Sequence, residues 1–170
     1  MSADGERERQ KGAMTSMDVR VAVVDGERFF RDAICEILDG AGFACAEAED
    51  AATALALCSD ESIGVAVLDL ELPGADGLDV LRGLHESRPD LRVLVVSASM
   101  DQETVLEALR IGACDYLAKP LHDEELVLAV RRAAEGHQLV AESTRLGRQL
   151  HRLASLCTMA SATSSRSAVT

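Results

Sequence analysis

Short apolar, β-branched segments alternate along the chain with segments of helical periodicity. The segments of the first kind lie at residues 20–25, 43–46, 64–69, 91–97 and 115–118. Three of them are continuous apolar runs rather than alternating ones, which is typical of parallel strands covered on both faces. The segment at 43–46 is the weakest of the five. We therefore predict five strands of one parallel sheet.

The intervening segments carry apolar residues with helical spacing. Phe30, Ile34 and Leu38 belong to one such stripe, and similar stripes predict further helices at 51–58, 78–84, 105–112 and 123–134. The last of these begins with three acidic residues, which stabilise a helix N-terminus. Strands and helices thus alternate five times, which predicts an α/β fold: a doubly wound five-stranded parallel sheet.

The two ends of the chain lack this alternation. Residues 1–18 are polar and aperiodic, and residues 158–170 are rich in Ser, Thr and Ala. We predict a disordered leader over 1–18, a single domain over 19–136 and a disordered tail over 158–170.

Residues 137–157 predict a helical extension of the last helix. Leu139, Leu146 and Leu153 repeat every seven residues, and Leu150 lies four beyond Leu146. This spacing is that of a short coiled coil, with Gly147 as its one weak helix former. The extension would dimerise the chain, dock back on its own domain, or become ordered with a partner.

Composition excludes several classes of function. The chain has 170 residues with a net charge of −12, so it lacks the basic footprint of a DNA-binding surface. No apolar run approaches the ~18 residues that a membrane span requires, and the N-terminus has no signal-peptide core. The five cysteines form no CxxC pair, which indicates small hydrophobic side chains in a reducing cytosol. We predict a cytoplasmic protein.

Polar residues stand where the predicted strands end. Asp25 follows the first strand, Asp69 the third, Ser97 the fourth and Lys119 the fifth. Because ligands of such sheets bind at the carboxyl ends of the strands, these side chains would share one rim. Two carboxylates suit Mg²⁺, and a lysine suits an anion. The rim therefore predicts a phosphoryl-transfer site with a carboxylate nucleophile.

Two longer motifs make this interpretation more specific. D-L-E-L-P-G-A-D-G follows the third strand, and G-A-C-D-Y-L-A-K-P surrounds the fifth. From Val19 to about Gly136 the chain resembles the receiver domain of two-component response regulators, the CheY-like superfamily. The resemblance implies a flavodoxin-like (βα)5 fold, to which the leucine spacing adds an extended C-terminal helix.

The resemblance also assigns roles to individual residues. Asp69 would be the phosphoacceptor and Lys119 the partner of the phosphoryl group. Ser97 would be the switch hydroxyl and Tyr116 the switch aromatic. Pro120 would follow the lysine through a cis peptide bond.

The implied metal site departs from the family pattern. Asp25 and Asp69 would bind Mg²⁺ with their side chains and Glu71 with its backbone carbonyl. The family usually has two consecutive acids after the first strand, whereas this chain has Gly26 at the second position. Losing that ligand should weaken Mg²⁺ binding, and Glu27 is the candidate replacement.

The function implied is that of a phosphoacceptor and not of an enzyme with external turnover. A sensor histidine kinase or phosphotransfer protein would donate a phosphoryl group to Asp69, and the domain itself would catalyse only the formation and hydrolysis of its acyl phosphate. Output would be a conformational change read by a downstream protein. The alternative is a phosphorylation-independent pseudo-receiver that acts as a dimerising adaptor.

Overall fold

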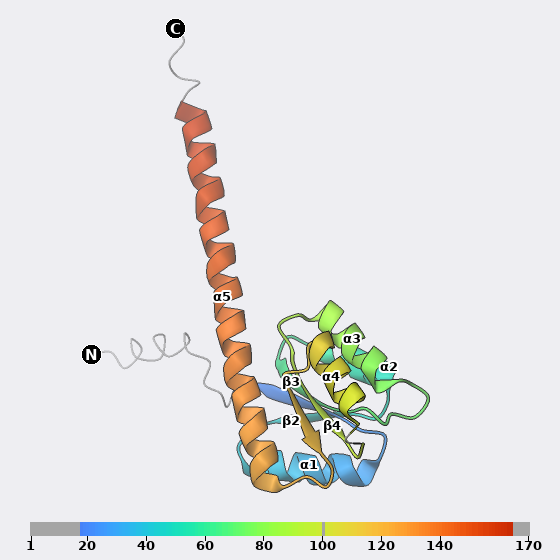
Figure 1. Cartoon of the computed structure of the whole chain (residues 1–170). Coiled ribbons are helices and arrows are strands. Elements are labelled where there is room, and N and C mark those ends of the chain that lie inside the picture. Colours follow the sequence, from blue (N-terminus) through green and yellow to red (C-terminus); the bar gives the residue numbers. More distant parts are fainter. Residues whose placement is uncertain (1–17, 100, 165–170) are drawn as a thin grey trace, which may run out of the picture. The chain divides into compact units, whose positions relative to one another are not determined.

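The computed structural model describes residues 18–99 and 101–164, with side chains as far as Thr158. Its elements, in order, are β1 (Arg20–Val24), α1 (Arg28–Gly40), β2 (Cys45–Ala48), α2 (Ala51–Cys58), β3 (Ile63–Asp69), α3 (Gly77–Ser87), β4 (Arg92–Ser97), α4 (Gln102–Ile111), β5 (Asp115–Ala118) and α5 (Asp123–Ser164) (Figure 1). The five strands form one parallel sheet in the order β2-β1-β3-β4-β5. This topology confirms the predicted doubly wound fold.

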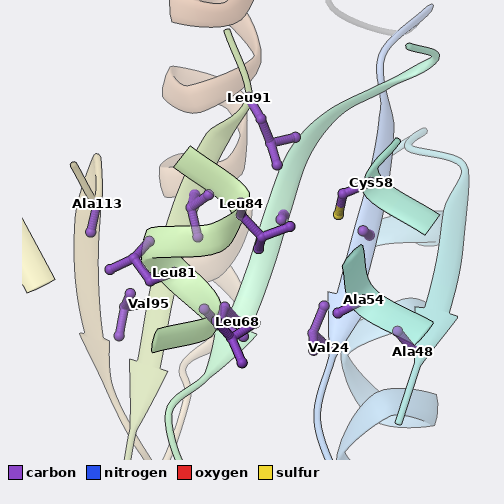
Figure 2. Close-up of a cluster of buried hydrophobic side chains, with 14 of the residues drawn as sticks. Val24, Ala48, Ala54, Cys58, Leu68, Leu81, Leu84, Leu91, Val95 and Ala113 are labelled. Atoms are coloured by element: carbon purple, nitrogen blue, oxygen red, sulfur yellow. The ribbon is translucent and has the colours of Figure 1, made fainter. Parts of the chain in front are cut away.

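Alternate residues of the central strands pack into two separate cores. On β1, Val21 and Val23 face α1 and the first half of α5, whereas Ala22 and Val24 face α2, α3 and α4. Figure 2 shows this second core, where Leu81 and Leu84 of α3 lie against the sheet. Both faces are covered, which explains why β1, β3 and β4 have continuous apolar sequences.

The edge strand β2 lies two residues later than the sequence pattern indicates. The prediction was 43–46, whereas the strand is Cys45–Ala48, with Val21 of β1 beside Cys45. Phe43 is buried although it precedes the strand, because the turn at Gly42 (φ 91°) directs the chain back over the core. The apolar side chain of Phe43 therefore belongs to the hydrophobic core and does not indicate where β2 begins.

Helix α5 is longer than predicted. It continues to Ser164, seven residues into the segment expected as a tail from residue 158. That stretch has no Gly or Pro and contains Ala and Met, which favour helix. No helix of the described residues is long and apolar enough to cross a membrane. The predicted leader, apart from Asp18, lies outside the described residues.

The chain divides into two compact units within this helix, one ending at Gln138 and one beginning at Leu139. The second unit carries the leucine repeat. Leu139, Leu146, Leu150 and Leu153 are all exposed within it.

A glycine at the start of α3 sets the position of the loop after β3. A Cβ on Gly77 would lie 2.4 Å from the Cα of Leu70 and 2.5 Å from its carbonyl oxygen. The first turn of α3 therefore lies directly on the backbone that follows Asp69. This close approach fixes the loop that carries Glu71.

Substitution of this glycine tests the contact. We expect Gly77→Ala to lower the free energy of unfolding by about 2–3 kcal/mol, because the new methyl group overlaps backbone atoms. Gly83→Ala in the same helix is the matched control. Its Cβ would meet only Leu55 Cδ2, at 3.4 Å, and it should stabilise the protein by up to ~1 kcal/mol. Urea unfolding measures both, and equal effects would contradict the packing.

Candidate functional site

The carboxyl ends of β1 and β3 bring two buried carboxylates to the same edge of the sheet. Asp25 directly follows β1 and Asp69 is the last residue of β3, and the two strands are neighbours. Only 2% of Asp25 and 4% of Asp69 is exposed. Two buried carboxylates this close to each other require a cation, because each disfavours the charge of the other.

Lys119 supplies that cation from the end of β5. Its Nζ donates hydrogen bonds to Asp25 Oδ2 at 3.0 Å and to Asp69 Oδ2 at 2.9 Å. Burial lowers the pKa of Lys119, but the hydrogen bonds and negative charges of the two carboxylates outweigh that effect and hold the pKa above 10.5. The lysine is therefore charged at neutral pH and joins the two acids. The Lys119–Pro120 bond that follows is cis.

The other oxygen of each carboxylate binds its own loop. Asp25 Oδ1 accepts a hydrogen bond from the backbone N–H of Glu27 at 2.8 Å, and Asp69 Oδ1 accepts one from that of Glu71 at 3.0 Å. Each aspartate thus directs one oxygen to Lys119 and fixes the turn after its strand with the other. The side chains of Glu27 and Glu71 are exposed, so the structure does not place them among the buried acids.

Ser97 and Tyr116 both bind the backbone of Ser99. Ser97 ends β4 beside Ala118 of β5, and its Oγ accepts a hydrogen bond from the N–H of Ser99 at 3.0 Å. The hydroxyl of Tyr116 donates to the carbonyl of the same residue. Ser97 is buried, Tyr116 is half-buried and Ser99 is exposed. The two candidate switch residues are therefore connected through one residue of the β4–α4 loop.

The residue after Asp25 is in close contact with the loop after β3. A Cβ on Gly26 would lie 2.5 Å from Cδ of Pro73 and 3.1 Å from its Cγ. The proline ring occupies the space that the Cβ of any other residue at position 26 would need. Glycine at position 26 and this position of Pro73 depend on each other, which the sequence alone did not indicate.

Two side chains of α1 complete the site, and neither was predicted. The ring of Phe30 lies 4.4 Å from Lys119 Nζ and makes a cation–π contact. The Nη1 of Arg31 donates to the carbonyl of Asp25 at 2.8 Å, and its Nε lies 3.4 Å from Glu47 Oε1 of β2. An arginine inside the apolar stripe of α1 was the available signal for this role.

The oxygen atoms at this edge suit a hard cation. Among the described residues, no three His, Cys, Asp or Glu side chains gather into a metal-binding cluster. The two carboxylates of Asp25 and Asp69 nevertheless match the one or two with which Mg²⁺ is usually held, the remaining ligands being water and phosphate oxygens. The residues present therefore fit Mg²⁺, with fewer protein ligands than two consecutive acids would give.

Comparison with curated proteins identifies relatives among transcriptional regulators. Over 128 residues the chain is 38% identical to the C4-dicarboxylate transport transcriptional regulatory protein DctD of Pseudomonas aeruginosa, covering 75% of this chain and 28% of that protein. It is 29% identical over 137 residues to the transcriptional regulatory protein FixJ of Bradyrhizobium diazoefficiens, covering 80% of this chain and 67% of FixJ. This chain thus spans less than a third of the length of DctD.

Solved structures agree with these relatives. The receiver domain of NtrX from Brucella abortus superimposes with a TM-score of 0.64 at 36% identity, covering 68% of this chain and 98% of that one. A response regulator from Burkholderia pseudomallei with a phosphorylated aspartic acid, a calcium ion and citrate gives a TM-score of 0.64 at 29% identity, covering 74% of this chain and 73% of that one. The model of the response regulator receiver domain matches residues 21–131. The chain therefore belongs to the family of response regulator receiver domains.

Proposed function

We propose that Asp69 accepts a phosphoryl group from a phosphohistidine of a sensor kinase or phosphotransfer protein. One observation carries this proposal: Lys119 Nζ binds the buried carboxylates of Asp25 and Asp69 at the same time, at 3.0 and 2.9 Å. A cation held beside a buried carboxylate is what a carboxylate nucleophile needs when an anionic group approaches it.

In this reaction a carboxylate oxygen of Asp69 attacks phosphorus. The P–O bond forms, the P–N bond to the donor imidazole breaks, and the imidazole leaves with the electron pair. Lys119 then binds oxygens of the transferred phosphoryl group in place of the Asp69 oxygen that now bridges carbon and phosphorus in the acyl phosphate. Although burial lowers the pKa of Lys119, Asp69 and Asp25 raise it, so the lysine is charged when the donor approaches.

We propose Mg²⁺ as the cation that assists this transfer. When bound, it offsets the negative charge of the transferring group. Asp25 and Asp69 would hold it with their carboxylates and Glu71 with its backbone carbonyl, while Glu27 is close enough in sequence to contribute. The donor set supports this assignment, and Gly26 explains why binding should be weaker than with two consecutive acids.

The contacts of Ser99 suggest how the modification is read. The hydroxyl of Ser97 would turn to a phosphoryl oxygen and so leave the N–H of Ser99. Because the hydroxyl of Tyr116 binds the carbonyl of the same residue, a shift of Ser99 would release the tyrosine. The β4–α4 loop would then change its conformation together with the face formed by the fourth and fifth helices.

We infer that output passes through contacts with another protein. The net charge of −12 disfavours direct binding to a nucleic acid. The domain catalyses only its own phosphorylation and dephosphorylation. The phosphorylated donor protein is thus the substrate of this reaction. We expect the protein to be located in the reducing cytoplasm.

Incubation with a small-molecule phosphodonor and Mg²⁺ tests the phosphoacceptor. We expect the intact mass to rise by one phosphoryl group in the wild type and not in Asp69→Asn, because an amide at position 69 removes the proposed nucleophile. Asp76→Asn is the matched control, since Asp76 lies on the same loop and an amide keeps its cap on α3. This variant should be labelled like the wild type.

Two results would contradict the assignment. Labelling of Asp69→Asn would place the phosphoryl group elsewhere. An unmodified wild type, under conditions that label an ordinary receiver, would favour the phosphorylation-independent adaptor.

The contact between Gly26 and Pro73 predicts how Mg²⁺ affinity can be raised. Gly26→Asp alone should destabilise the protein by about 1–3 kcal/mol, because its Cβ meets the proline ring. Gly26→Asp combined with Pro73→Ala should bind Mg²⁺ about tenfold more tightly than Pro73→Ala alone, since a carboxylate is added to the donor set. Urea unfolding measures the stability of Gly26→Asp, and NMR titration with Mg²⁺ measures the affinities of the double variant and of Pro73→Ala. Equal affinities would show that position 26 does not face the metal.

We also propose that the helix from Leu139 onward pairs with a second copy of the chain as a short coiled coil. Leu139, Leu146, Leu150 and Leu153 follow the 3-4 spacing of a coiled-coil seam. Between 49% and 70% of each is exposed, although apolar side chains in a repeating stripe favour burial. A second copy presents the same stripe and would cover it.

Sedimentation velocity of the full chain tests this pairing. We expect a dimer for the wild type and a monomer for Leu146→Glu/Leu153→Glu, because four buried charges per dimer would face each other in the seam. Thr144→Glu/Ser155→Glu carries the same added charge on the same helix away from the seam, and it should remain dimeric. A monomeric wild type at tens of micromolar would contradict the proposal.

A further inference from the structure

Helix α1 and the edge strand β2 are connected by two successive pairs of side chains. Arg31 and Glu47 form the first pair, with Nε 3.4 Å from Oε1. Cys35 lies one helical turn after Arg31, and Cys45 lies two residues before Glu47. The four residues of helix from Arg31 to Cys35 span ~6 Å, and the two residues of strand from Glu47 back to Cys45 span ~6.7 Å. Because these lengths are nearly equal, Cys35 lies opposite Cys45 as Arg31 lies opposite Glu47.

The two cysteines do meet at this second position. Each thiol is among the groups that shift the pKa of the other, which places the two side chains next to each other. Both residues are half-buried at the rim of the core that α1 and α5 form with the sheet. Two thiols from different elements therefore lie next to each other, and neither is fully enclosed.

We propose that Cys35 and Cys45 are an oxidisable dithiol that forms a disulfide between α1 and β2. The other three cysteines do not offer such a pair. Cys58 is buried, and its thiol interacts with Arg88 and not with another thiol. Cys114 interacts with Arg92, and Cys157 is exposed in the second unit.

The surroundings keep the reduced pair protonated. Burial is the main cause that raises the pKa of Cys45 to about 12, and Cys35, Asp39 and Glu47 add to it. The pKa of Cys35 is raised by burial and by the charges of Glu47 and Asp32, although Cys45 and Arg31 lower it. Both thiols are therefore protonated at neutral pH and stable under reducing conditions.

The oxidant is a peroxide. The sulfur of Cys35, as thiolate, attacks one peroxide oxygen, the O–O bond breaks and the other oxygen leaves as water after taking a proton. The sulfur of Cys45 then attacks the sulfenic sulfur of Cys35, losing its proton, and the S–O bond breaks to release a second water. The sum is two thiols and one hydrogen peroxide giving one disulfide and two waters.

The disulfide would also affect the edge of the sheet where Asp25 lies. Arg31 is one turn from Cys35, and its guanidinium donates to the carbonyl of Asp25 at 2.8 Å. A covalent bond on the next pair would hold α1 against β2 and so limit the movement of Arg31. The redox state of this pair and the loop after β1 are thus mechanically connected.

Mass spectrometry of the full chain treated with hydrogen peroxide tests the proposal. We use Cys58→Ser/Cys114→Ser/Cys157→Ser, which retains only the two cysteines in question, with circular dichroism to confirm the fold. We expect the loss of two hydrogen atoms, reversed by dithiothreitol. Cleavage at acidic residues, such as Glu36 and Asp39 between the cysteines, should leave the two peptides joined.

Further single substitutions distinguish the pair from a general reaction. In the wild type, Cys114→Ser should leave the disulfide intact, whereas Cys35→Ser and Cys45→Ser should each abolish it. The oxidised chain should unfold at a Tm about 5 °C or more above the reduced chain, because the closed loop restricts the unfolded state. Absence of the two-hydrogen loss, a link between other cysteines, or sulfinic acid at Cys35 without a link would each overturn the proposal.

Discussion

The edge of the sheet depends on one ionic arrangement, in which a lysine ammonium joins two buried carboxylates. Asp25 and Asp69 would repel each other at the ends of neighbouring strands, and Lys119 makes their proximity tolerable. Each carboxylate then has one oxygen left for the turn that follows its strand. The ring of Phe30 from the start of α1 lies against the same ammonium group. The same charges hold the two loops that follow β1 and β3.

Close packing around the site limits which side chains it accepts. Pro73 occupies the space beside Gly26, and Gly77 allows α3 to lie on the backbone of Leu70. Both contacts act on the loop between β3 and α3, which is thus held from two directions. Position 26 is therefore more than a site without an acidic side chain, because Pro73 of the neighbouring loop is packed against it. A larger residue at position 26 would need changes in both loops.

The parts of this structure that the sequence predicted are those in which one local pattern has one physical cause. β1, β3 and β4 were recognised because burial on both faces makes them continuously apolar, and Asp69 and Lys119 because parallel strands end at a common edge. β2 was misplaced because a half-exposed edge strand has little pattern, and Phe43 belongs to the core without belonging to the strand. The end of α5 was missed because Ser and Thr suggested a tail. The roles of Arg31, Phe30 and Pro73 arise from contacts between segments distant in sequence, which no local pattern encodes.

The near absence of lysine from the chain has a consequence for chemical modification. The sequence has two lysines, and Lys119 is the one within the described residues. Reductive methylation with isotope-labelled formaldehyde would thus introduce few methyl groups, and those on Nζ of Lys119 would sit between two carboxylates and against an aromatic ring. Ring current and local charge would separate that NMR signal from the others. The chain carries, by its composition alone, a built-in spectroscopic probe at the centre of its functional edge.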